Sequence, residues 1–236
     1  MASAELHFLD VAGRRIAYRV RDGACPTLVF LPGYASDMEG TKALALDAFA
    51  ERRGLAMLRL DYSGTGSSGG RFEDGTLGLW LEEALAAIDG LAQGPLVLVG
   101  SSMGGWIALH LALLRPDRVA ALVAIAAAPD FTDWGFADGE AATRQGLARG
   151  FWESGQRLLL LGKDIGIDCP VRLLHGERDE EVPLDIAFRL MRALRSSDVQ
   201  LNVLKGGGHR LSEPHEIDAI LHTVAALIEQ PLEPVR

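Results

Sequence analysis

The chain has 236 residues and a formal net charge of −9, and 48% of its residues are hydrophobic. This length allows one α/β domain with a sizeable core, and the negative charge without a basic cluster disfavours a nucleic-acid partner. No apolar run approaches the length of a membrane span, so we expect no stable membrane insertion. The N-terminal residues lack a basic segment followed by an apolar core, and the two cysteines, Cys25 and Cys169, lack a metal-ligand spacing. We therefore expect no secretory signal and a reduced, cytoplasmic setting.

Strand and helix patterns alternate along the chain. The first half of the chain predicts a hairpin of two strands, at Leu6 to Asp10 and Arg14 to Val20, and further strands at 27–31 and 55–60. A helix from Ser36 or Asp37 to about Arg53 separates these two later strands, and a helix from Asp74 or Thr76 to about Ala92 follows them. Strands at 95–100, 118–128, 170–175 and 199–204 follow. The helices between and after them cover the apolar run from Trp106 to Leu114, with Pro116 marking the helix end, then 183 to about 195, and a last helix that starts at Pro214. This alternation predicts an α/β fold with a doubly wound, mostly parallel sheet and the antiparallel hairpin at one edge.

Residues 130–168 interrupt this alternation. The segment mixes aromatic and polar residues and predicts two short helices. It is inserted between core strands at the edge where α/β proteins bind ligands. We therefore interpret it as a small helical cap in a single domain spanning residues 1–236. Phe131, Trp134 and Trp152 are candidate substrate-binding residues on its apolar underside, and the alternative is that these aromatics form the small core of the cap itself.

The stretch around Ser102 has the pattern of a nucleophile elbow. Gly100, Ser102 and Gly104 match Gly-x-Ser-x-Gly between a predicted strand and a predicted helix. A serine at the apex of such a turn needs neighbours with almost no side chain, because the strand and the helix pass in van der Waals contact. The helix also directs its N-terminal N–H groups toward an oxygen that becomes negative. Ser101 does not fit the apex, because Val99 would then take the first glycine position.

A serine nucleophile needs a general base and an acid that orients this base. His209 is the preferred base, because it lies in a glycine-rich loop after the last strand, and His215 is the alternative. The loop after the strand at 170–175 carries four acids, Glu177, Asp179, Glu180 and Glu181. Asp179 is the preferred acid because a short carboxylate is held more rigidly, but spacing leaves the choice open. Each predicted group follows a core strand, so all three should lie on one edge of the sheet.

Two backbone N–H groups are expected to form an oxyanion hole. One belongs to Met103, directly after Ser102, and the other to Tyr34, in the loop after the strand at 27–31. The arrangement predicts acyl transfer to Ser102, followed by deacylation by a water molecule that His209 activates. This chemistry requires no metal and no organic cofactor.

Several segments resemble one group of α/β-hydrolase fold serine hydrolases, the mitochondrial palmitoyl-protein thioesterase and acyl-glucuronide esterase group with its bacterial relatives. The segments are Leu31 to Leu46, Asp61 to Ser67, Gly100 to Trp106 and Cys169 to Gly176. The resemblance extends over about residues 27–130 and 168–229. It implies the α/β-hydrolase fold throughout the chain.

By position, the same resemblance implies a nucleophile at Ser102, an acid at Asp179 and a base at His209. It also implies cleavage of long-chain acyl thioesters on protein cysteines or of acyl glucuronides. The segment 130–168 is shorter than the cap of that group. Because substrate choice resides in the cap, small esters and acyl thioesters stay open as substrates.

Other functions and assemblies are compatible with the sequence. The fold also hosts ligand-binding receptors that retain a triad with vestigial turnover, as well as C–C bond hydrolases and lyases. A dehalogenase is disfavoured, because it needs an aspartate at position 102. The exposed sheet edge and the cap are both candidate interfaces for a homodimer.

Overall fold

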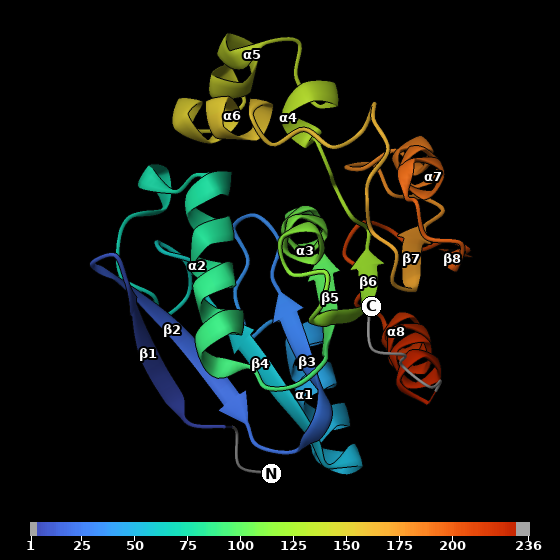
Figure 1. Ribbon diagram of the computed structural model, residues 1–236. Helices are drawn as coiled ribbons and strands as arrows, with labels where there is room; N and C mark the ends of the chain where they lie inside the picture. The colour runs from blue at the N-terminus through green and yellow to red at the C-terminus, as the bar shows by residue number, and fades with distance from the viewer. Residues whose placement is uncertain (1–3, 230–236) are drawn as a thin grey trace.

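The computed structural model describes residues 4–229, which form an eight-stranded sheet with helices on both faces (Figure 1). The strands are β1 (Leu6–Val11), β2 (Arg14–Arg21), β3 (Ala24–Leu31), β4 (Leu55–Leu60), β5 (Leu96–Ser101), β6 (Val119–Ile125), β7 (Val171–Gly176) and β8 (Val199–Leu204). The helices are α1 (Thr41–Arg53), α2 (Leu77–Leu91), α3 (Met103–Leu114), α4 (Phe131–Trp134), α5 (Gly139–Arg144), α6 (Arg149–Gln156), α7 (Leu184–Ala193) and α8 (Pro214–Ile228), with a 3-10 turn at Phe72–Asp74. Within these residues, no helix has the length and apolarity needed to cross a membrane.

The sheet confirms the predicted fold class. Its strand order is β1-β2-β4-β3-β5-β6-β7-β8. The hairpin strand β2 pairs antiparallel with both β1 and β4, and every later pairing is parallel. The parallel strands therefore share one carboxyl edge, where the chain can gather side chains from several loops.

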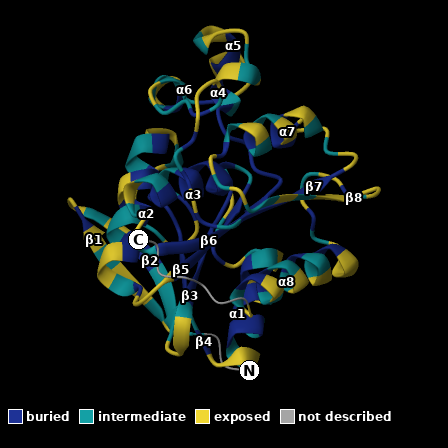
Figure 2. Ribbon diagram, turned by 45° about the vertical axis from the view of Figure 1, so that its right-hand side comes forward, coloured by how far each residue is buried: buried dark blue, intermediate teal, exposed yellow. Residues whose placement is uncertain are grey.

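Two apolar layers enclose the central strands. On one face, α2 and α3 contribute a layer that contains Trp80 and the β5 residue Leu98. On the opposite face, α1 and α8 contribute a layer that contains Phe49 and the next β5 residue, Val99. Successive side chains of a strand point to opposite faces, so a strand buried on both faces is apolar at every position. Figure 2 shows the central strands buried between the two helical layers.

Helix α1 begins at Thr41 and not at Ser36 or Asp37, as the sequence predicts. The Asp37 carboxylate accepts a hydrogen bond from the backbone N–H two residues later, at 2.8 Å. The buried Asp61 carboxylate, at the end of β4, accepts another from the N–H of Met38, at 2.7 Å. These two bonds hold a non-helical turn before α1.

Other boundaries depend on caps and on the turn at Ser102. Thr76, and not Asp74, caps α2, because its hydroxyl accepts a hydrogen bond from the N–H of Leu79 at 3.2 Å. Strand β6 ends at Ile125, before the predicted end at 128. The N–H of Ala128 instead donates to the carbonyl oxygen of Ser102 at 3.1 Å, which directs the chain over the serine.

Residues 130–168 are here called the cap segment, and their helices lie beyond the end of the sheet toward which β5 and β6 run (Figure 1). The segment contains α4, α5 and α6, whereas the sequence predicts two helices. Helices α4 and α5 have only four and six residues, too few to show an apolar period. The start of α5 is fixed by Asp138, whose carboxylate accepts a hydrogen bond from the N–H of Ala141 at 2.7 Å.

Asp130 joins the start of the cap segment to the chain that follows α6. Its buried carboxylate accepts hydrogen bonds from the N–H of Leu160, at 2.8 and 3.0 Å, and from that of Leu161, at 2.6 Å. Burial raises the pKa of Asp130 above its usual range, although these N–H groups act in the opposite direction. The carboxylate therefore holds the chain after α6 against the chain that leaves β6.

We expect Asp130→Ala to lower the free energy of unfolding by about 2–3 kcal/mol, because two backbone N–H groups lose their acceptor. Asp133→Ala, which removes an exposed carboxylate from α4, should change it by less than about 0.5 kcal/mol. Urea denaturation followed by circular dichroism measures both variants. Equal stability of the two would show that Asp130 does not fasten the cap segment.

Candidate active site

Ser102 occupies a strained turn between β5 and α3. Its backbone has φ 53° and ψ −120°, a conformation that residues with a side chain rarely adopt. A Cβ atom on Gly100 would lie 2.3 Å from the carbonyl oxygen of Gly104. A Cβ atom on Gly104 would lie 2.1 Å from the carbonyl oxygen of Leu31. The turn thus has the close backbone contacts that the Gly-x-Ser-x-Gly pattern predicts.

We expect Gly104→Ala to destabilise the protein by about 3 kcal/mol or more, because the new methyl group meets backbone that can relieve the clash only by moving the strand or the helix. Gly90→Ala is the matched control. Gly90 lies exposed in α2, and a Cβ atom there meets nothing within 4 Å. This substitution should stabilise the protein by about 0.5–1 kcal/mol through helix propensity. Thermal and urea unfolding of both variants measure the contrast, and a Gly104→Ala variant as stable as wild type would contradict it.

Ser102, His209 and Asp179 form one hydrogen-bonded line. The Oγ atom of Ser102 lies 3.0 Å from Nε2 of His209, and Nδ1 of His209 lies 2.9 Å from Oδ2 of Asp179. The three residues follow β5, β8 and β7, at the carboxyl edge of neighbouring parallel strands (Figure 1). The fold therefore brings together the three groups that the sequence predicts to meet.

The Asp179 side chain is buried, and its carboxylate takes part in three hydrogen bonds. Its Oδ1 atom accepts hydrogen bonds from the N–H groups of Glu181, at 3.0 Å, and Val182, at 2.8 Å. Burial alone would raise the pKa of Asp179, but the His209 hydrogen bond and charge, together with these two N–H groups, lower it below its usual range. An ionised Asp179 favours the His209 tautomer with hydrogen on Nδ1, which leaves Nε2 to accept the Ser102 proton.

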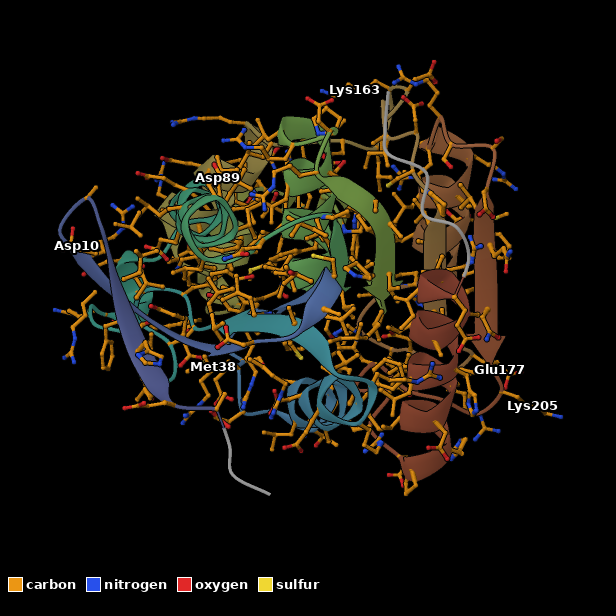
Figure 3. The ribbon with its side chains drawn as sticks, turned by 60° about the horizontal axis from the view of Figure 1, so that its bottom comes forward. Asp10, Met38, Asp89, Lys163, Glu177 and Lys205 are labelled. Atoms are coloured by element: carbon orange, nitrogen blue, oxygen red, sulfur yellow. The ribbon has the colours of Figure 1, made fainter. Side chains whose placement is uncertain are left out.

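None of the other three acids of this loop lies at Nδ1 of His209. Glu177 accepts a hydrogen bond from the N–H of Gly206 at 2.9 Å, and Figure 3 shows it beside Lys205. Its carboxylate therefore holds the loop that carries His209, but its hydrogen bond goes to Gly206 and not to His209 itself. Glu180 is exposed. Glu181 approaches His209 at Nε2, at 3.7 Å, and not at Nδ1, so the structure separates it from the position of an orienting acid.

The remaining histidines near the site have structural contacts. His175 is buried, and its Nε2 atom lies 2.9 Å from the carbonyl oxygen of Val182 and 3.5 Å from Oδ2 of Asp179. His175 thus supports the acid loop. His110 contacts the carbonyl oxygen of Leu158 at 2.9 Å. His215, the alternative base, lies exposed on α8.

Two backbone N–H groups lie beside Ser102 without an acceptor among residues 4–229. They belong to Tyr34 and to Met103, the first residue of α3. The first N–H groups of a helix have no intrahelical partner. The loop that carries Tyr34 packs against the serine, because a Cβ atom on Gly33 would lie 3.3 Å from Cβ of Ser102. The Tyr34 ring is held by Phe72 and Phe151, each with ring centroids 5.0 Å away.

A cavity of about 650 Å³ opens beside Ser102. One part of its wall is largely apolar and includes Phe131, Trp134 and Phe136 of the cap segment together with Ala128 and Val182. Another part is polar and includes Ser36, Asp37, Thr41, Lys42, Arg210 and Ser212. No pattern in the sequence indicates this polar wall, because its members come from two stretches far apart in the chain, the turn and helix start at 36–42 and the loop at 210–212.

Trp152 does not line this cavity, contrary to the sequence prediction. Its ring packs on the start of α5, where a Cβ atom on Gly139 would lie 2.8 Å from it. Trp152 therefore belongs to the interior of the cap segment, whereas Phe131 and Trp134 face the cavity. Within residues 4–229, no group of three or more His, Cys, Asp or Glu side chains is placed to hold a metal ion.

A serine on a strand-to-helix turn of such a sheet, with an acid and a histidine on the loops that follow later strands, is the arrangement of α/β hydrolases. A sequence profile of the alpha/beta hydrolase fold matches residues 26–151, and the chain belongs to this family. It is 37% identical over 235 residues to the human mitochondrial palmitoyl-protein thioesterase ABHD10, a match that covers 91% of this chain and 77% of the human protein.

Solved structures agree with this assignment. Alpha/beta hydrolase domain-containing protein 10 from mouse superposes with a TM-score of 0.89 and 35% identity, covering 96% of this chain and 99% of the mouse chain. A protein from Agrobacterium vitis S4 superposes with a TM-score of 0.88 and 38% identity, covering 95% and 99%. These comparisons confirm the family resemblance inferred from the sequence motifs.

Proposed function

We propose that this protein is a serine hydrolase that cleaves carboxylic ester or acyl-thioester bonds through an acyl-enzyme intermediate. The observation that carries the proposal is the line of hydrogen bonds from Ser102 through His209 to Asp179, at 3.0 and 2.9 Å. Similarity to a palmitoyl-protein thioesterase over 91% of the chain supports esters and thioesters as the substrate class.

In the proposed reaction, Oγ of Ser102 attacks the carbonyl carbon of the substrate while Nε2 of His209 takes the hydroxyl proton. The ionised Asp179 stabilises the resulting imidazolium. The N–H groups of Tyr34 and Met103 donate to the oxyanion of the tetrahedral intermediate. His209 then gives its proton to the departing alcohol or thiol, and the acyl group stays on Ser102. A water molecule, deprotonated by His209, releases the acid by the same steps.

We further propose that the chain acts as a single domain in which the cap segment shapes the acyl site. The apolar wall formed by Phe131, Trp134 and Val182 suits the acyl group, because an acyl chain that is transferred from water onto apolar side chains is stabilised. A cytoplasmic setting and a homodimer stay predictions, and the names of the mammalian relatives place those proteins in mitochondria.

A matched series of acyl esters and acyl thioesters, with chains from two to sixteen carbons, tests the proposal. We expect turnover of both bond types with a clear optimum in chain length, set by the space between the cap segment and Ser102. Release of the acid and of the alcohol or thiol in equal amounts would be measured. Absence of hydrolysis across the whole series would contradict the proposed function.

A further inference from the structure

Glu181 places a second carboxylate beside the ring nitrogen of His209 that faces the serine. Its Oε2 atom lies 3.7 Å from Nε2 of His209, while Asp179 lies at Nδ1. The imidazole therefore has one carboxylate near each nitrogen. The two differ in environment, because the Asp179 side chain is fully buried, whereas that of Glu181 is 70% exposed and lines the cavity.

The loop holds Glu181 in this place. The N–H groups of Glu181 and Val182 both donate to Oδ1 of Asp179, at 3.0 and 2.8 Å. The carbonyl oxygen of Val182 lies 2.9 Å from Nε2 of the buried His175. The same carboxylate that orients His209 thus fixes the backbone of Glu181, and this backbone position brings the Glu181 side chain within reach of His209.

This position brings Glu181 close to any leaving group. In the proposed reaction the departing oxygen or sulfur takes its proton from Nε2 of His209, so it must come within hydrogen-bonding distance of that atom. A charge a few bonds further along the leaving group then lies about 5–7 Å from the Glu181 carboxylate. At an exposed site, a unit charge at this distance changes an equilibrium or rate by about threefold, so the ratio between a cationic and an anionic leaving group changes by about tenfold.

Among the charged side chains that line the cavity, Glu181 is the one that lies beside Nε2 of His209. The charged side chains that line the cavity, apart from the base His209, are Asp37, Lys42, Glu181 and Arg210. Lys42 donates a hydrogen bond to the carbonyl oxygen of Arg210, and the negative charge of the buried Glu216 acts on it. Among residues 4–229, only Asp179 and Glu181 have a carboxylate oxygen within 4.0 Å of a His209 ring nitrogen.

We propose that Glu181 determines specificity by the charge of the leaving group, so that esters and thioesters of neutral or cationic alcohols and thiols are cleaved in preference to those of anionic ones. This inference rests on the proposed hydrolase function and names the substrate class of the same site. Glu181 acts on the leaving group through its field, while Asp179 orients the base.

Three butyryl thioesters with one acyl group and different thiols test the inference. Butyrylthiocholine is cationic, the thioester of 3,3-dimethylbutane-1-thiol is its neutral analogue, and the thioester of 3-mercaptopropionate is anionic. Thiol release gives kcat/KM for wild type, for Glu181→Gln and for the control Glu180→Gln, at low and high salt. Glu180 is the exposed neighbour on the same loop and does not line the cavity.

At low salt we expect wild type to favour the cationic thioester over the anionic one by tenfold or more. Glu181→Gln should reduce this ratio by about tenfold, Glu180→Gln should leave it within about twofold, and high salt should compress it in wild type. An unchanged ratio in Glu181→Gln, or an equal change in Glu180→Gln, would overturn the role of Glu181. Absence of wild-type turnover of all three thioesters would instead contradict the proposed hydrolase function, so the two failures are distinguishable.

Discussion

Replacement of Ser102 by alanine is expected to lower kcat by about 10⁴- to 10⁶-fold while the protein stays folded. The hydroxyl is the only atom removed, and it supplies the attacking oxygen in the proposed mechanism. Residual catalysis would come from the oxyanion hole and from binding, which remain when a triad member is lost. Turnover of the neutral butyryl thioester, measured beside urea unfolding, gives both quantities.

Ser67→Ala provides the control, because Ser67 is exposed and its side chain does not line the cavity. Its kcat should stay within about twofold of wild type. If Ser102→Ala hydrolysed the thioester at the wild-type rate, another nucleophile would have to act, and the proposed function would lose its central residue.

Asp179→Asn should lower kcat by about 10³- to 10⁴-fold. The neutral amide does not stabilise the His209 imidazolium and permits the tautomer with hydrogen on Nε2, which cannot accept the Ser102 proton. Glu180→Gln, a neutral amide one residue away in an exposed position, should stay within about twofold of wild type. Wild-type turnover by Asp179→Asn would show that another acid orients His209.

The same substitution has a signature in stability. Because the pKa of Asp179 is lowered in the folded protein, its ionised form contributes stability that is present above the unfolded pKa of about 4. This contribution is lost as pH falls through the lower folded pKa. Between neutral pH and about pH 3, wild type should therefore lose stability relative to Asp179→Asn, as urea denaturation at several pH values would show.

Much of the fold and of the candidate site is encoded in local patterns. Continuous apolar runs between helical segments indicate parallel strands that are covered on both faces, and the sheet has them. Parallel strands also place their carboxyl ends on one edge, so residues directly after three of them could be predicted to meet. Ser102, Asp179 and His209 do meet. Spacing left the choice among the neighbouring acids open; the short side chain favoured Asp179, and the family resemblance implied the same residue.

The sequence predictions differ from the structure where contacts between residues far apart in the chain determine a helix boundary or a side-chain position. The start of α1 depends on a hydrogen bond from Met38 to Asp61, which comes from another strand end. Trp152 turns into the cap segment because it packs on Gly139, a contact that no periodicity reveals. The approach of Glu181 to His209 also joins two loops far apart in sequence. Sequence patterns place residues on elements, but they do not give side-chain contacts between loops.

The most direct test of the central claim is labelling with a serine-reactive phosphonate, followed by intact mass measurement and peptide mapping. The probe reacts with an activated serine that has a base and oxyanion donors beside it. We predict one phosphonyl group per chain, on the peptide that contains Ser102, with much slower labelling in Asp179→Asn and none at this position in Ser102→Ala. Absence of label on Ser102 in a folded wild-type protein, or stoichiometric label on another residue, would contradict the proposal that Ser102 is the nucleophile.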